Sequence, residues 1–148
     1  MNEYFINKGT CAIIPVEEEV SKVIELDGEF IVNRSVSDII DMSCKYFGCS
    51  YLGRLEGSKM ILNMNYKLPI VVDEIKNLIF FPTSSPRFDD CVWISLCNIL
   101  SYSKYNAFSK VCFNNGIVLD LKISYYCLEN QIFRATMLDS LLRKRKNS

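Results

Sequence analysis

Short runs of hydrophobic residues, broken by polar and turn-forming residues, predict β-strands near the start of the chain. Residues 10–18, TCAIIPVEE, are a short apolar run with a proline, which is typical of an edge strand because proline cannot donate a backbone hydrogen bond. Residues 22–26 and 29–33 are two β-rich runs joined by Asp27-Gly28. An Asp-Gly pair tolerates the positive φ of tight turns, so these runs predict a hairpin.

The first helical pattern follows this hairpin. Ser35 with Asp38, or Ser37 with Asp41, supplies an N-cap and an acid in the first turn. Apolar side chains then recur at helical spacing, at Ile40, Cys44 and Phe47. Gly48 suits the end of this helix, and we expect a glycine-punctuated turn after it.

The pattern becomes β again from residue 59. Six runs are candidate strands: 59–66, 68–72, 77–82, 92–99, 110–115 and 117–124. The Asn114-Asn115-Gly116 sequence predicts a second hairpin turn, and residues 82–90, PTSSPRFDD, predict a loop. The last 21 residues, 128–148, carry a broad apolar stripe that predicts a packed terminal helix.

These elements predict the fold class. We expect an α+β protein, a β-rich single domain over residues 1–148 with hairpins, one internal helix and one C-terminal helix. The chain begins without a signal-peptide pattern, and its longest apolar runs are too short to cross a bilayer, so we expect a cytoplasmic protein that does not enter the membrane.

Charge is unevenly distributed along the chain. Residues 1–42 carry nine acids and three bases, a net charge of −6, whereas residues 43–148 carry eight acids and fourteen bases, a net charge of +6. The basic part could attract a polyanion although the total charge is zero, and an ordinary mixed surface is the alternative. The RKRK sequence at 143–146 is similarly open to two interpretations, a solvated helix end or a nucleic-acid contact.

Catalytic and metal-binding patterns are scarce. The chain has no histidine and no phosphate-loop, dinucleotide-binding or serine-hydrolase motif. Its seven cysteines include no C-x-x-C pair, and most lie among apolar neighbours, which is typical of buried thiols. We therefore expect no enzyme, no catalytic residue, no metal and no cofactor. A small cysteine-dependent enzyme or redox sensor remains the alternative.

Residues 44–54, CKYFGCSYLGR, interleave basic and aromatic side chains. Together with Ser43, this stretch resembles the ComK family of competence transcription factors from Gram-positive bacteria. Further stretches stand in the family's order at about its spacing: KLPIVVD, FFPTSSPR, CVWIS, FNNG and ISYYCLENQIFR. They span roughly residues 43 to 134, and the N-terminal 35 residues match the family only in outline.

The resemblance implies a sequence-specific DNA-binding activator of DNA-uptake genes. It implies binding to A/T-rich double-stranded DNA through the minor groove, as a homo-oligomer or as a hetero-oligomer with a longer relative, with RNA polymerase as a further partner. Longer members continue past the terminal helix with a tail implicated in activation and in recognition by a proteolytic adaptor. Because this sequence stops at LLRKRKNS, a short form that modulates a full-length partner is the alternative function.

Five basic residues are the candidate DNA contacts on grounds of residue type and placement. Arg54 follows a glycine in the expected turn, and we expect its guanidinium to enter the minor groove. Lys45 and Lys59 suit phosphates, and Arg87 is a second groove candidate. Arg134 could contact DNA or pair with Glu129 or Asp139 on its own helix.

Two further expectations concern the aromatic residues and the effect of replacing Arg54 on DNA binding. Tyr46 and Tyr51 could contact sugar edges or pack against protein, and Trp93 is expected in the core. The Arg54→Ala variant is expected to weaken binding to an A/T-rich duplex by about 1–3 kcal/mol.

Overall fold

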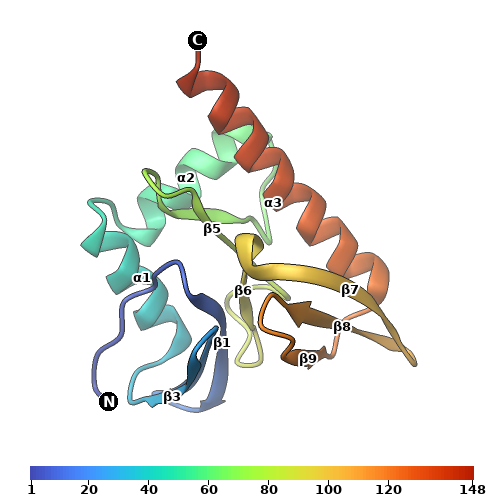
Figure 1. The fold of residues 1–148 in the computed structure, drawn as a ribbon. Coiled ribbons are helices and arrows are strands. Elements are labelled where there is room, and N and C mark those ends of the chain that lie inside the picture. The colour runs from blue at the N-terminus through green and yellow to red at the C-terminus, as the bar shows by residue number, and fades with distance from the viewer.

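The computed structural model describes all 148 residues and contains nine strands and three α-helices (Figure 1). The helices are α1 (Val36–Tyr46), α2 (Tyr51–Leu62) and α3 (Tyr125–Lys146), with a short 3-10 helix, η1 (Leu96–Asn98). The strands are β1 (Thr10–Glu17), β2 (Val20–Glu25), β3 (Gly28–Val32), β4 (Ile70–Asp73), β5 (Leu78–Pro82), β6 (Trp93–Ser95), β7 (Ile99–Tyr105), β8 (Phe108–Phe113) and β9 (Val118–Leu121). The predicted α+β class is confirmed.

The strands form two antiparallel sheets. The larger has six strands in the order β3-β2-β1-β6-β5-β4, and the smaller has three in the order β7-β8-β9. The predicted Asp27-Gly28 hairpin is the β2–β3 connection, with Glu25 opposite Gly28. The predicted turn at Asn114–Gly116 joins β8 to β9, and Gly116 has a φ of +89° that suits glycine.

Alternating side chains of the large sheet fill two separate cores. In β5, Leu78 and Phe80 belong to the core shared with α1, whereas Ile79 and Phe81 belong to the core shared with α3 and the small sheet. This alternation follows from the two-residue period of a strand. Both faces of the sheet are therefore covered, and the predicted burial of Trp93 is confirmed, since it is 3% exposed.

The predicted helix stop and turn at Gly48 are confirmed, with a φ of +100° there, but the turn is short. Helix α2 begins at Tyr51 and replaces the rest of the expected turn and the predicted strand at 59–66. Ser50 caps the helix by accepting a hydrogen bond from the Gly53 backbone N–H, and Asp41 accepts one from the Tyr51 N–H. Leu55 packs against both cores, from the same face of the helix that carries Tyr51 and Leu62. That double packing outweighs the cost of glycine in a helix, about 1 kcal/mol per residue.

Two strand predictions, one missed hairpin and one helix start also need correction. β1 is central, not an edge strand; Pro15 is tolerated because the neighbouring β6 pairs only with Ala12 and Ile13. The run 92–99 is not one strand, since η1 separates β6 from β7. The hairpin of β7 and β8 was not predicted, and α3 begins three residues before the predicted start, where Ser124 accepts a hydrogen bond from the Cys127 N–H.

Candidate nucleic-acid interface

Two of the five candidate basic residues, Lys45 and Arg54, form ion pairs with carboxylates. Lys45 Nζ lies 2.9 Å from Asp41 Oδ2 on the preceding turn of α1. The Tyr51 backbone N–H and the Lys45 ammonium hold the pKa of Asp41 below its usual value, so this carboxylate stays charged. Lys45 therefore offers less free positive charge than its sequence position indicates.

Arg54 does not lie in a turn, and its guanidinium does not extend freely into solvent. It lies on α2, its side chain is only 16% exposed, and Nη1 is 3.8 Å from Glu74 Oε2. Its Nη2 donates to the Phe47 carbonyl at 3.4 Å, near the end of α1. The expectation of a freely extended Arg54 is therefore wrong, because the helix directs this side chain inward.

Lys59 and Arg87 are both exposed and lie in no ion pair. Lys59 lies on α2, away from any cation–aromatic contact. Arg87 lies in the loop of residues 83–92, and its guanidinium carbon is 5.9 Å from the centre of the Phe88 ring. The aromatic ring lowers the cost of holding this cation away from acidic partners.

Arg134 pairs with neither of the carboxylates considered for it. Its Nη1 donates to the Tyr66 carbonyl at 3.0 Å, and the guanidinium lies 5.8 Å from the Tyr66 ring centre. Glu129 instead accepts hydrogen bonds from two tyrosines, and Asp139 pairs with Arg143 at 2.9 Å. Arg134 therefore fixes the segment that carries Tyr66.

The loop that carries Arg87 has a defined conformation. Its ends are joined by the Thr83 N–H donating to the Val92 carbonyl at 2.8 Å, and by the Val92 N–H donating to the Thr83 hydroxyl at 3.1 Å. The buried Cys91 thiol contacts the Ser84 carbonyl at 3.5 Å. These contacts hold Arg87 in place and give Cys91 a structural role.

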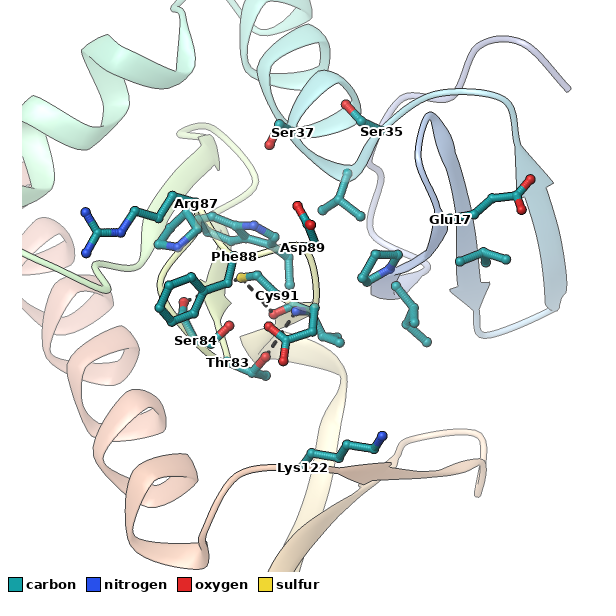
Figure 2. Close-up of a pocket in the computed structure, with 18 of the residues that line it drawn as sticks. Glu17, Ser35, Ser37, Thr83, Ser84, Arg87, Phe88, Asp89, Cys91 and Lys122 are labelled. Carbon is teal, nitrogen blue, oxygen red and sulfur yellow. Dashed lines mark hydrogen bonds between the residues drawn. The ribbon is translucent and has the colours of Figure 1, made fainter.

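Two grooves flank this loop. The larger, of about 1130 Å³, separates the β1–β2 hairpin from the loop and from Lys122 after β9 (Figure 2). Most of its charged lining is acidic: Glu17, Glu18, Glu19, Asp89, Asp90 and Asp120. Figure 2 shows Arg87 extending toward α3, on the opposite side from Glu17. The acidic groove does not suit a polyanion.

The smaller groove, of about 520 Å³, lies on the side toward α3 and contains Tyr66, Lys67, Arg87 and Phe88. Its lining continues to Cys127 in the first turn of α3. The preceding residue, Tyr126, is 70% exposed, and Lys104 Nζ of β7 lies 5.4 Å from its ring centre. Cations from three separate segments thus lie against exposed aromatic rings, Arg87 and Arg134 at this groove and Lys104 on the other flank of the first turn of α3.

We call this region the aromatic–cation surface. It consists of Tyr66, Lys67, Arg87, Phe88, Lys104, Tyr126 and Arg134. None of its four cations forms an ion pair with a carboxylate. It unites Arg87 and Arg134 from the sequence-based set and adds Lys67 and Lys104, which that set omits. The interleaved basic and aromatic residues of YSKYNAFSK, 102–110, are the signal that could have identified Lys104.

The other aromatic and basic candidates mostly contact residues of the chain itself. Tyr46 stacks on Phe5 with ring centres 4.6 Å apart, and Tyr51 packs edge-on to Trp93 at 6.0 Å. In the RKRK sequence, Lys146 donates to the Glu74 carbonyl at 2.7 Å, so part of this helix end is tied to the β4–β5 turn. Lys144 and Arg145 are exposed without an ion pair.

The three buried cysteines, Cys11, Cys44 and Cys91, do not show the features of a reactive nucleophile. Burial raises the pKa of Cys44 to about 12 and that of Cys11 to about 11, and it also raises the pKa of Cys91. A catalytic thiol requires a shift in the opposite direction. Separately, none of the helices is long and apolar enough to cross a bilayer.

Comparisons with known proteins agree on one family. The family described as ComK protein matches residues 1–147. The chain is 36% identical over 150 residues to the competence transcription factor of Bacillus subtilis (strain 168), an alignment that covers 98% of this chain and 78% of that protein. No solved structure matches the chain. The chain belongs to the ComK family of competence transcription factors, which are not enzymes.

Proposed function

We propose that this chain regulates competence genes by binding A/T-rich double-stranded DNA through the minor groove, using the aromatic–cation surface. The chief support is that Lys67 and Arg87 at the smaller groove, and Lys104 beside the first turn of α3, have no carboxylate paired to them. Unpaired cations release condensed counterions when they meet phosphates, and this release drives binding.

The A/T preference in this proposal has a physical basis. A-tracts have a narrow minor groove with enhanced negative potential, which attracts inserted arginine or lysine. Arg87 is the preferred groove residue because it is exposed and held by a structured loop. Lys104 and Lys67 would contact phosphates, and Lys59 remains a proposed phosphate contact from α2.

Arg54, Lys45 and Arg134 are not the main DNA contacts in this proposal. Arg54 would support the α1–α2 corner, and Lys45 would contribute only a partly neutralised charge. Arg134 would position Tyr66 at the DNA surface and would not read bases directly. The regulator would act in the cytoplasm, as a single domain, with RNA polymerase as its partner during activation.

Gel-shift titration on A/T-rich and G/C-rich duplexes of equal length, at two salt concentrations, tests this function. We expect tighter binding to the A/T-rich duplex and a steep loss of affinity as salt increases. Absence of a shift at the lower salt concentration would contradict it.

A second candidate function is hetero-association with a longer relative without DNA binding. The observation in its favour is on α2, where Leu52 and Met60 are 68% and 84% exposed and contact neither core. Such side chains occur at contacts with other chains. Sedimentation of the chain alone and mixed with a full-length family member tests it, and a Leu52→Ala/Met60→Ala variant should lose association.

A further inference from the structure

The hairpin of β7 and β8 ends in two exposed aromatic side chains. Tyr105 and Phe108 are opposite each other across its last register position and are 47% and 48% exposed. The turn between them starts at Asn106, whose φ of +55° asparagine tolerates well. Figure 1 shows this hairpin projecting away from the rest of the molecule.

Folding does not account for these two aromatic residues. Neither side chain belongs to or packs against the two hydrophobic cores. Both lie on the sheet face that carries Lys110, whose Nζ is 5.5 Å from the Tyr105 ring centre. The opposite face of the hairpin carries Val111, which is fully buried in the core shared with α3. The tip thus exposes apolar surface that the chain itself does not cover.

The surroundings of the tip favour a polyanionic partner. Lys104 and Lys110 flank Tyr105 and Phe108, and β7 and β8 contain no aspartate or glutamate. Asp120 of β9 is opposite Lys110 in the register, but neither lysine forms an ion pair. Lys104 also belongs to the aromatic–cation surface through its contact with Tyr126. Lys104 is opposite Ser109 and so lies on the other face of the hairpin from Tyr105, which places one lysine on each face of the tip.

We infer that the β7–β8 hairpin inserts its tip into the minor groove and that Tyr105 and Phe108 act as an aromatic wedge between base pairs. This inference rests on the proposed DNA-binding function. Two-stranded ribbons can enter DNA grooves, and apolar side chains inserted between base steps partly unstack them. Lys104 and Lys110 contact the flanking phosphates, and Asn106 lies where a side-chain amide can reach A/T base edges.

Duplexes with a single 2-aminopurine, placed in turn at each adenine of an A/T-rich site, test the wedge. The fluorescence of this base rises when its stacking is disrupted. We expect the unaltered protein to raise it at one step of the site. The Tyr105→Ala/Phe108→Ala variant should lose this rise and bind about tenfold or more weakly, whereas Phe108→Leu, which keeps an apolar wedge, should retain the rise.

Ile75→Ala is the matched control, because Ile75 is a 90% exposed apolar residue in the turn of another hairpin, β4–β5. This variant should bind and unstack DNA as the unaltered protein does. If the unaltered protein binds DNA but the double variant gives the same affinity and fluorescence, the wedge is wrong and the proposed function stands. A double variant that loses self-association while keeping DNA affinity would also overturn the wedge, because the tip would then be a protein contact. If the unaltered protein binds no DNA, the proposed function itself fails.

Discussion

Arg54 of α2 and Glu74 of the β4–β5 turn form an ion pair, with Nη1 3.8 Å from Oε2. The same guanidinium donates to the Phe47 carbonyl at the end of α1, and its Nε is buried without a partner. One side chain thus connects two helices and a hairpin turn. Its environment is that of a structural arginine.

Arg54→Ala is therefore expected to lower the free energy of unfolding, by about 1–2 kcal/mol, because packing of the arginine stem and a carbonyl partner are lost. Urea unfolding measures this change. Lys45→Ala is the control, since its exposed ion pair on one helix should contribute less than about 0.5 kcal/mol. The structural role would be contradicted if Arg54→Ala were as stable as the unaltered protein but bound A/T-rich DNA more weakly, by about 1–3 kcal/mol. Arg54 would then contact DNA directly.

Asn98→Ala is expected to destabilise the fold by about 2–3 kcal/mol, because its buried amide donates to the Lys8 and Thr10 carbonyls, both at 2.8 Å. Asn115→Ala is the matched variant. Its amide donates to the Leu26 carbonyl at 3.0 Å but is exposed, so water can replace it and the loss should stay below about 1 kcal/mol. If urea unfolding gives equal losses of stability for the two variants, burial of the amide does not determine how much stability is lost.

Thiol titration of the native protein should show two fast-reacting cysteines. Cys97 and Cys127 are exposed, whereas Cys11, Cys44 and Cys91 are buried and should react only after unfolding. Replacing Cys97 and Cys127 by serine should remove the fast phase. Fast labelling of Cys44 or Cys91 in the folded protein would contradict the described burial.

Stability should decrease at alkaline pH, partly because of Cys44. Burial keeps this thiol protonated in the folded state, with a pKa of about 12. In the unfolded chain it ionises near pH 8.5, so above that pH the unfolded state holds fewer protons and is favoured. The contribution is at most about 1.4 kcal/mol per pH unit.

Urea unfolding at about pH 7.5, 9 and 10 measures this effect. The Cys44→Ala variant should lose stability less steeply with pH than the unaltered protein, whatever its stability at pH 7.5. Parallel slopes for the two proteins would show that Cys44 is not the group responsible.

Local signals in the sequence were sufficient for much of the fold. The Asp27-Gly28 hairpin and the helix that begins after Ser35 were predicted because turn and cap residues act within a few positions. Helix α2 was missed because Gly53 and Gly57 lower helix propensity, and the helix is stabilised by tertiary packing against both cores.

The candidate interface depended more on long-range structure. Tyr66, Arg87, Lys104 and Tyr126 come from four segments that only the folded sheets and α3 bring together. Sequence reasoning selected basic residues by their local context, and it could not tell that Glu74, 20 residues away, pairs with Arg54. Lys45 is a different case, because its partner Asp41 is four residues earlier on the same helix, a spacing that is visible in the sequence.

The most direct test of the account compares two variants that lose equal charge. One carries Lys67→Asn, Arg87→Ala and Lys104→Ala, which removes unpaired cations; asparagine at 67 suits the positive φ there. The other carries Lys22→Ala, Lys45→Ala and Arg143→Ala, which removes cations that already have carboxylate partners.

The measurement is the affinity for an A/T-rich duplex over a range of salt concentrations. The first variant should bind about 30-fold or more weakly than the unaltered protein, with a salt slope shallower by about 2 to 3. The second should stay within about threefold of the unaltered protein. Equal losses in the two variants, or a larger loss in the second, would contradict the claim that DNA binds at the aromatic–cation surface.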